Sequence, residues 1–118
     1  MQKVVITGHD LTVDQIIAVC REGAEVVLSD ESREKILASR QVVNELVEER
    51  KVVYGITTGF GKFSDVVISQ DECKLLQKNL IITHAVGAGD PFKEDIARGI
   101  LLLRVNSLSN GFSGICLE

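Results

Sequence analysis

The stretch that decides how this chain folds reads Val53-Tyr54-Gly55-Ile56-Thr57-Thr58-Gly59-Phe60-Gly61. It holds three glycines and two threonines, and the helical period of the flanking segments does not continue through residues 52–65. Such composition predicts an ordered loop, here over residues 52–65, between two segments with a helical period. Loops held between helices often contain catalytic groups, so this segment is the first place to look for chemistry.

Four interpretations of this loop compete. A phosphate-binding loop fails because Ile56 stands where its first glycine belongs and Phe63 where its metal-binding hydroxyl belongs. A dinucleotide fingerprint fails because Ser64 replaces its third glycine and no βαβ unit surrounds it. Two interpretations remain open: a glycine-rich turn around a buried Tyr54, or a reactive Tyr54 phenol with flexible backbone on both sides. A free phenol loses its proton near pH ~10, so a tyrosine base needs surroundings that favour the phenolate.

Outward from the loop, local signals predict a mainly helical chain with short strands near its start (α+β). Capping boxes at Thr12-x-x-Gln15 and Ser69-x-x-Glu72 mark two helix starts, and Asp90-Pro91 marks a third. The predicted helices cover about 12–21, 30–49, 70–86 and 91–107, and the predicted strands are 4–6 and 25–28.

Composition excludes several function classes. The chain has 118 residues, 13 Lys plus Arg against 17 Asp plus Glu, and a net charge of -4, which gives no basic surface for nucleic acid. We find neither a signal peptide nor an apolar run long enough to span a membrane, so a cytoplasmic location is expected. Cys20, Cys73 and Cys116 are too widely spaced for a metal site or disulfide framework and are predicted to be small buried residues.

A second candidate residue is His84, near the end of the apolar segment Leu80–Val86. A histidine there is most simply a core residue or one that interacts with the helix C-terminus. No second ligand is spaced to build a metal site with it. A binding role remains the alternative, because a neutral imidazole both donates and accepts hydrogen bonds.

Taken together, these segments resemble the aromatic amino acid ammonia-lyase and aminomutase family, and the histidine-deaminating members most closely. The resemblance runs in order along essentially the whole chain, and the 54–61 stretch is its most specific part. The other residues that match are Leu11-Thr12, Arg21-Glu22-Gly23, Ser39-Arg40, Leu76-Gln77-x-Asn79-Leu80-Ile81, His84-Ala85-x-Gly87, Pro91-Phe92, Leu102-Leu103-Arg104-x-Asn106 and Gly111-x-Ser113-Gly114.

The resemblance implies that residues 1–118 are the N-terminal segment of a longer ammonia-lyase and end before its main helix bundle. The parent enzyme would convert L-histidine to urocanate and ammonia. Its electrophile would be a methylidene-imidazolone, formed from an Ala-Ser-Gly tripeptide, which makes the substrate amine a better leaving group. No Ala-Ser-Gly occurs in this chain, and Phe112-Ser113-Gly114 is the nearest approach to it. We therefore expect the isolated chain to be inactive.

The resemblance also assigns roles to residues. Tyr54 would be the base that removes the β-proton, and His84 would contact the aromatic side chain of the substrate. Gly61 and Ala85 would line the substrate pocket. The parent enzyme would bind a small aromatic amino acid and form a homo-oligomer, expected to be a tetramer, without nucleic acid, membrane or metal.

Two alternatives stay open. One is a lyase or aminomutase for tyrosine or phenylalanine, although a histidine facing a phenylalanine ring would lack partners for its nitrogens. The other is a non-catalytic binding module that keeps the fold.

Overall fold

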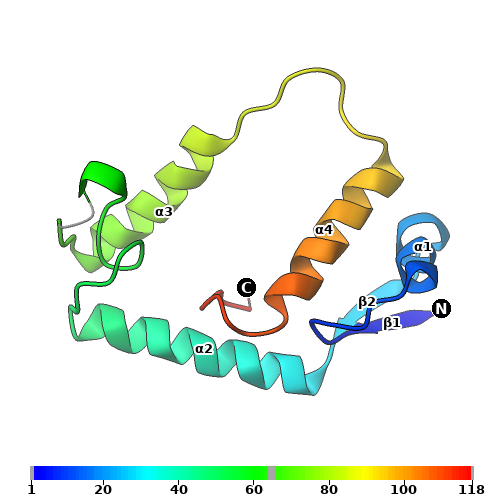
Figure 1. The fold of residues 1–118 in the computed structure, drawn as a ribbon, viewed down its shortest axis with the longest axis horizontal. Coiled ribbons are helices and arrows are strands. Elements are labelled where there is room, and N and C mark those ends of the chain that lie inside the picture. The colour runs from blue at the N-terminus through cyan, green and yellow to red at the C-terminus, as the bar shows by residue number, and fades with distance from the viewer. Residues whose placement is uncertain (1, 64–65, 118) are drawn as a thin grey trace. The chain divides into compact units, whose positions relative to one another are not determined.

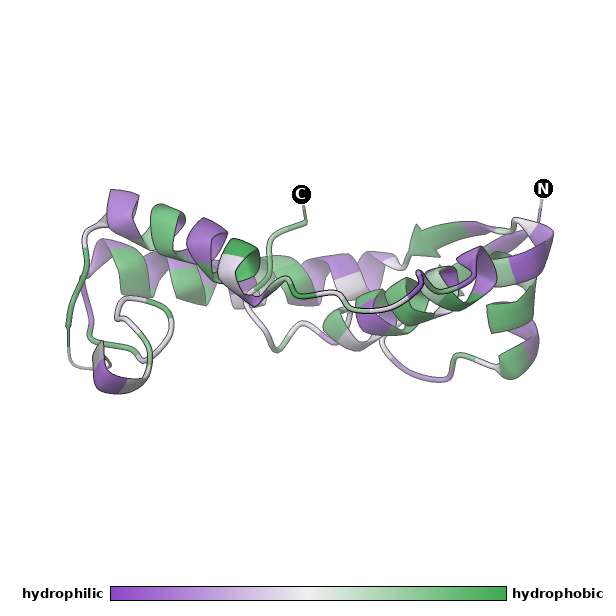
Figure 2. Ribbon diagram, turned by 90° about the horizontal axis from the view of Figure 1, so that it is seen from above, coloured by the Kyte–Doolittle hydropathy of each residue, from purple (hydrophilic) through white to green (hydrophobic). Residues whose placement is uncertain are grey.

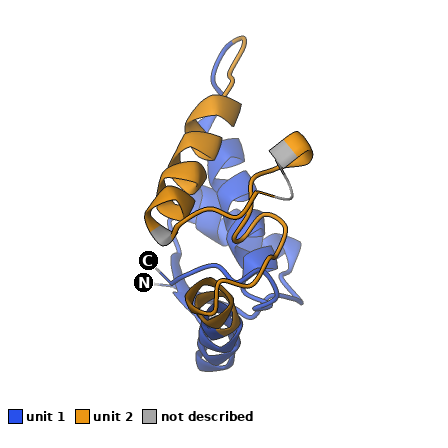
Figure 3. Cartoon of the chain, turned by 90° about the vertical axis from the view of Figure 1, so that its left-hand side faces the viewer, with its two compact units in different colours: residues 1–41, 90–118 blue, residues 42–89 orange. Residues whose placement is uncertain are grey.

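The computed structural model describes residues 2–63 and 66–117 and divides the chain into two compact units (Figures 1 and 3). Unit 1 comprises residues 1–41 and 90–118, and unit 2 comprises residues 42–89. The elements in chain order are β1 (Lys3–Ile6), α1 (Val13–Glu22), β2 (Glu25–Leu28), α2 (Asp30–Glu48), the 3₁₀ helix η1 (Gly61–Phe63), α3 (Gln70–His84) and α4 (Glu94–Leu108). The predicted class, mainly helical with short strands near the start, is confirmed.

Unit 1 is built on a β–α–β arrangement. Strands β1 and β2 pair in parallel, with Lys3 opposite Glu25 and Ile6 opposite Leu28, and α1 forms the connection between them. Side chains alternate along β1, so that Val4 and Ile6 are buried while Val5 is exposed. Helix α1 packs against α4, and the buried apolar residues of this unit are Val4, Ile6, Ala18, Ile36 and Leu102. Figure 2 shows that apolar and polar residues are interspersed along the helices of the chain.

Both predicted capping boxes are present. The Thr12 hydroxyl accepts from the Gln15 amide at 3.3 Å, and the Gln15 side chain accepts from the Thr12 amide at 2.9 Å. Ser69 and Glu72 repeat this exchange at the start of α3, at 3.3 and 2.9 Å. These reciprocal bonds satisfy amides that the first helical turn leaves without partners, which explains why local sequence placed both starts correctly.

Glu72 makes the second box sensitive to acid. The Ser69 amide, and then its hydroxyl at 2.7 Å, donate to the carboxylate and hold the pKa of Glu72 below its ordinary value. A depressed folded-state pKa gives stability that is present above the unfolded value, about 4.3, and lost as pH falls through the folded value. We expect the NMR shift of the Ser69 amide to titrate in this acid range. The Thr12 amide, whose partner Gln15 is neutral, is the internal control; parallel titration of both amides would contradict the assignment.

Helix α4 begins later than predicted. Asp90-Pro91 signals a start at residue 91, but the helix begins at Glu94, and its N-cap Lys93 makes no side-chain capping bond. The Asp95 carboxylate instead pairs with Arg21 of α1 at 3.2 Å and accepts from the Ile96 amide at 2.9 Å. The first turn of α4 thus includes an ion pair between residues far apart in sequence, Arg21 and Asp95. No helix begins at Asp90-Pro91, where the local signal predicted one. Helix α3 likewise ends at His84 rather than at residue 86.

The turn after α4 lies very close to α2. Gly111 has φ +73, and a Cβ atom added there would lie 2.6 Å from the backbone carbonyl carbon of Lys35. Gly23, which ends α1, has the same φ of +73, but a Cβ there would meet nothing within 4 Å. The two glycines therefore share one backbone conformation and differ in the space around them.

Unit 2 contains the end of α2, the glycine-rich segment, η1 and α3 (Figure 3). Helix α2 ends at Glu48, and Arg50, two residues later, has φ +52. The Arg50 amide donates to Val47 O at 3.2 Å, and the Lys51 amide donates to Leu46 O at 3.1 Å. This pair of backbone hydrogen bonds forms a Schellman C-cap, after which the chain enters the loop. The predicted loop 52–65 is present as far as it is described, with η1 inside it, and residues 64–65 lie outside the described residues.

Within residues 2–63 and 66–117, no helix has both the length and the apolar character needed to cross a bilayer.

Candidate functional site

Two buried threonines organise the loop around Tyr54. The Thr57 side-chain oxygen accepts from the Val53 amide at 2.9 Å, and its hydroxyl donates to the Lys51 carbonyl. The Thr58 oxygen accepts from the Gly55 amide at 3.3 Å and donates to the Gly59 carbonyl at 3.0 Å. The loop therefore closes on its own side chains.

Tyr54 lies at the surface of this loop. Tyr54 is 62% exposed, so the interpretation of a buried tyrosine is wrong. Its ring meets the Phe60 ring edge to face, with centroids 5.6 Å apart. Gly55 has φ +73, and a Cβ there would lie 3.1 Å from Phe60, so glycine allows the chain to turn tightly beside that ring. Among the described residues the Tyr54 hydroxyl has no hydrogen-bond partner, which leaves it accessible to a ligand.

His84 is the last residue of α3 and is exposed, so the core interpretation is wrong. Its Nδ1 lies 2.9 Å from the Leu80 carbonyl oxygen. Because a carbonyl oxygen only accepts, Nδ1 carries the proton in this contact, and a neutral ring then offers Nε2 as an acceptor. Within the described part of the chain Nε2 has no partner, so the imidazole presents one acceptor to solvent.

The structure does not join these two residues directly. The Cys73 thiol, in the first turns of α3, donates to the Ile56 carbonyl at 3.5 Å and ties the loop to that end of the helix. His84 lies at the other end of α3, about 16 Å further along the helix axis at 1.5 Å rise per residue. No bond or ring contact between Tyr54 and His84 occurs among the described residues. Their membership of one site therefore stays a prediction.

The two remaining predicted pocket residues lie in the loop and directly after α3. Gly61 begins η1 with φ +57, and a Cβ added there would meet nothing within 4 Å. Ala85 caps α3 and donates its amide to Ile81 O at 3.0 Å. Both are exposed, so both could approach a ligand.

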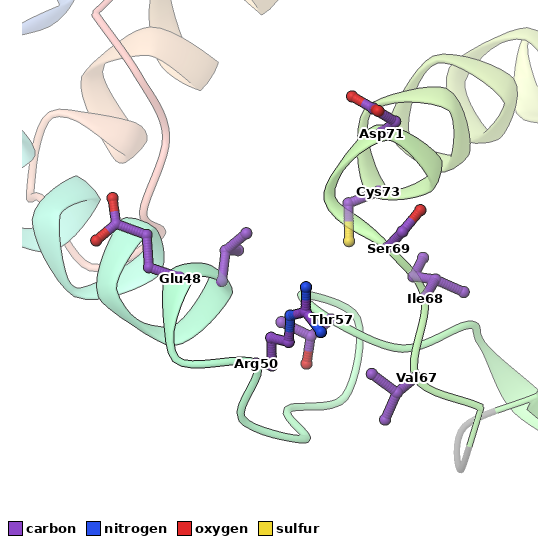
Figure 4. Close-up of a pocket in the computed structure, with 9 residues that line it drawn as sticks. Glu48, Arg50, Thr57, Val67, Ile68, Ser69, Asp71 and Cys73 are labelled. Atoms are coloured by element: carbon purple, nitrogen blue, oxygen red, sulfur yellow. The ribbon is translucent and has the colours of Figure 1, made fainter.

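A cavity of about 500 Å³ lies within unit 2, between the end of α2, the loop and the first turns of α3 (Figure 4). It contains none of the four predicted site residues. It is lined by Val47, Glu48, Arg50, Thr57, Val67, Ile68, Ser69, Asp71 and Cys73. No motif in the sequence signals this cavity, because its walls come from three separate segments.

The cysteines were only partly predicted. Cys20 and Cys73 are half-buried, whereas Cys116 is exposed, so the prediction of a buried residue is wrong there. Burial, followed by the nearby Glu72 carboxylate, raises the pKa of the Cys73 thiol. A thiol held in its neutral form is a poor nucleophile, so this shift disfavours nucleophilic chemistry at Cys73. The described residues hold no group of three or more His, Cys, Asp or Glu that could bind a metal.

The nearest approach to Ala-Ser-Gly is Phe112-Ser113-Gly114, which is bound to α2 in unit 1. The Gly114 amide donates to the Ser39 hydroxyl at 2.9 Å, and Arg40 Nη1 donates to the Gly114 carbonyl at 3.2 Å. Both backbone groups of Gly114 thus hold the tail on α2, and Phe112 replaces the alanine. These residues do not fit a self-cyclising tripeptide.

Comparison with known proteins links these features to a family. The family model "Aromatic amino acid lyase" matches residues 11–118. The chain is 55% identical over 118 residues to histidine ammonia-lyase of Caldanaerobacter subterraneus subsp. tengcongensis, covering all of this chain and 23% of that protein. The crystal structure of histidine ammonia-lyase from Trypanosoma cruzi aligns with a TM-score of 0.91 at 41% identity, covering 98% of this chain and 23% of that one. Tyrosine aminomutase from Streptomyces globisporus aligns with a TM-score of 0.86 at 34% identity, covering 96% and 22%. The chain spans about a quarter of the length of these relatives.

Proposed function

Because this chain belongs to the aromatic amino acid lyase family, we propose that it forms part of a full-length enzyme that converts L-histidine to urocanate and ammonia. The observation that carries this proposal is the 55% identity to a histidine ammonia-lyase over every residue of the chain. The accessible Tyr54 hydroxyl and the exposed His84 imidazole support it, since both could reach a ligand.

In this proposal Tyr54 is the base that takes the proton from the β-carbon of the substrate. Loss of that proton together with the amine leaves the double bond of urocanate. The Tyr54 hydroxyl has no hydrogen-bond partner among the described residues, so none of them would compete with the substrate for it. Gly61 and Ala85, with no bulky side chains, would allow the substrate to lie close to the backbone.

His84 would hold the imidazole of the substrate. With Nδ1 bonded to Leu80 O, Nε2 is the acceptor that suits the N–H of a histidine ring. The same acceptor suits the hydroxyl of tyrosine, and the similarity to a tyrosine aminomutase favours that substrate as the second candidate.

Members of the family use a methylidene-imidazolone group, formed from Ala-Ser-Gly, as the electrophile that makes the amine a better leaving group. This chain has no such tripeptide, so the group would come from another part of the full-length enzyme. We propose that residues 1–118 supply the base and a substrate contact to a cytoplasmic homo-oligomer, in which the exposed apolar side chains of α3 and α4, such as Ile81 and Leu101, become covered.

The isolated chain is expected to show no turnover. Incubated with L-histidine, it should give no urocanate absorbance above a blank without protein. A chimera in which these residues replace the matched segment of the Caldanaerobacter enzyme is the positive counterpart and should deaminate histidine. Turnover by the isolated chain would contradict the proposed division of labour.

Substrate choice is the test of His84. The full-length enzyme should have a higher kcat/KM for histidine than for tyrosine or phenylalanine. Replacing His84 with phenylalanine removes the acceptor and should lower kcat/KM for histidine about 10- to 100-fold, the cost of one unpaired polar group. The loss should be much smaller for phenylalanine, which has no polar group to leave unpaired. A preference for tyrosine in the parent enzyme would favour the second candidate.

A further inference from the structure

The amides on both sides of Tyr54 are held by buried threonine hydroxyls. Thr57 and Thr58 are only 2% and 0% exposed. The Thr57 hydroxyl oxygen accepts a hydrogen bond from the Val53 amide at 2.9 Å, and the Thr58 hydroxyl oxygen accepts one from the Gly55 amide at 3.3 Å. Val53 and Gly55 are the immediate neighbours of Tyr54, so the two hydroxyls bracket it.

Neither hydroxyl has a proton left to donate to a ligand. Each also donates, Thr57 to the Lys51 carbonyl and Thr58 to the Gly59 carbonyl at 3.0 Å. A hydroxyl has one proton to donate, so both protons are already committed. Their effect on chemistry would therefore pass through the backbone on either side of Tyr54.

The attachment of the loop to the rest of unit 2 does not depend on these hydroxyls. The Ile68 amide donates to the Thr57 carbonyl at 3.2 Å, and the Gly59 amide donates to the Val66 carbonyl at 3.3 Å. These backbone bonds are kept when the side chain changes. Removing a threonine hydroxyl should thus loosen the backbone beside Tyr54 while leaving the loop attached beside α3. The Val53 carbonyl would still accept from the Ile56 and Thr57 amides at 3.1 and 3.0 Å.

We propose that Thr57 and Thr58 are positioning residues that fix the backbone on both sides of Tyr54 and so set the place of its phenol in the proposed lyase reaction. The inference rests on the proposed function, because it matters for catalysis only if Tyr54 is the base. Small displacements of a catalytic group can cost as much as about 100-fold in rate, so the expected effects are large enough to measure.

The test compares Thr→Val, which removes the hydroxyl at nearly constant shape, with Thr→Ser, which keeps it. In the full-length enzyme, Thr57→Val and Thr58→Val should each lower kcat about 10- to 100-fold with KM changed less than about threefold. Thr57→Ser and Thr58→Ser should recover most of kcat. Thr7→Val is the matched control, because Thr7 donates to the His9 carbonyl in unit 1 and should leave kcat unchanged.

A double-variant cycle separates positioning from general support of the fold. If the threonines act through Tyr54, adding Thr58→Val to Tyr54→Phe should lower kcat no further. Losses that multiply in the double variant would overturn the inference, as would Thr→Val variants with parental kcat. If Tyr54→Phe alone leaves kcat unchanged, it is the proposed role of Tyr54 that fails.

A second measurement does not need catalysis. Tyr54 is the only tyrosine, and the chain has no tryptophan, so its ring resonances are unambiguous. In the 118-residue chain they should be shifted by the Phe60 ring. Thr57→Val or Thr58→Val should move them toward free tyrosine, and Thr→Ser should not. Unchanged Tyr54 resonances in both Thr→Val variants would also overturn the inference. This outcome counts even if one of the full-length variants is too unstable for kinetic measurements.

Discussion

Replacing Tyr54 with phenylalanine in the full-length enzyme should lower kcat about 10²- to 10⁴-fold, the usual contribution of one general base. The change removes a single oxygen from a side chain that is 62% exposed and whose hydroxyl has no partner among the described residues. The edge-to-face contact with Phe60 involves only the rings and should survive. Folding should thus be nearly unaffected while turnover collapses.

The measurement is steady-state kinetics with histidine, together with thermal unfolding of both proteins. Phe60→Leu is a useful companion, because it removes the neighbouring ring and keeps the hydroxyl, and its loss of kcat should be much smaller. A non-catalytic binding module makes the opposite forecast: Tyr54→Phe would leave all measured properties unchanged. That outcome would remove Tyr54 from the mechanism.

Replacing Gly111 with alanine should lower the free energy of unfolding of the chain by about 2–5 kcal/mol, from a left-handed backbone penalty plus overpacking. The added Cβ would lie 2.6 Å from the carbonyl carbon of Lys35, and backbone atoms of a helix cannot move away cheaply. Urea unfolding followed by circular dichroism measures the change.

Gly23→Ala is the matched control for this prediction. It has the same φ of +73 but nothing within 4 Å of the new Cβ, so it should cost only the backbone penalty, about 1–2 kcal/mol. The difference between the two variants isolates the contact with Lys35. Equal losses would mean that the close approach contributes nothing.

Short-range signals predicted the parts of the fold that depend on neighbours in sequence. The boxes at Thr12 and Ser69 each need only four consecutive residues, and both were placed correctly. The start of α4 was predicted three residues too early, and its first turn includes an ion pair with Arg21, which no local pattern reveals. Likewise, the exposure of Cys116 depends on what the tail packs against, not on its own sequence.

The candidate site was predicted in outline only. The glycines of the loop pointed to Tyr54, but its exposure and its contact with Phe60 became visible only in the structure. The hydrogen bonds of Thr57 and Thr58 to the loop backbone were missed, although two consecutive threonines in a glycine-rich loop are a signal for side-chain-to-backbone bonding. The cavity beside the loop had no signal at all.

The division of the chain has a consequence for how such enzymes diversify. Unit 2 is one uninterrupted segment, residues 42–89, whereas unit 1 is assembled from two separate segments. Tyr54 and His84 both lie in the uninterrupted one. A single recombination event could therefore exchange the proposed acid–base residue and the proposed specificity residue as a pair, while the host scaffold keeps its own sequence.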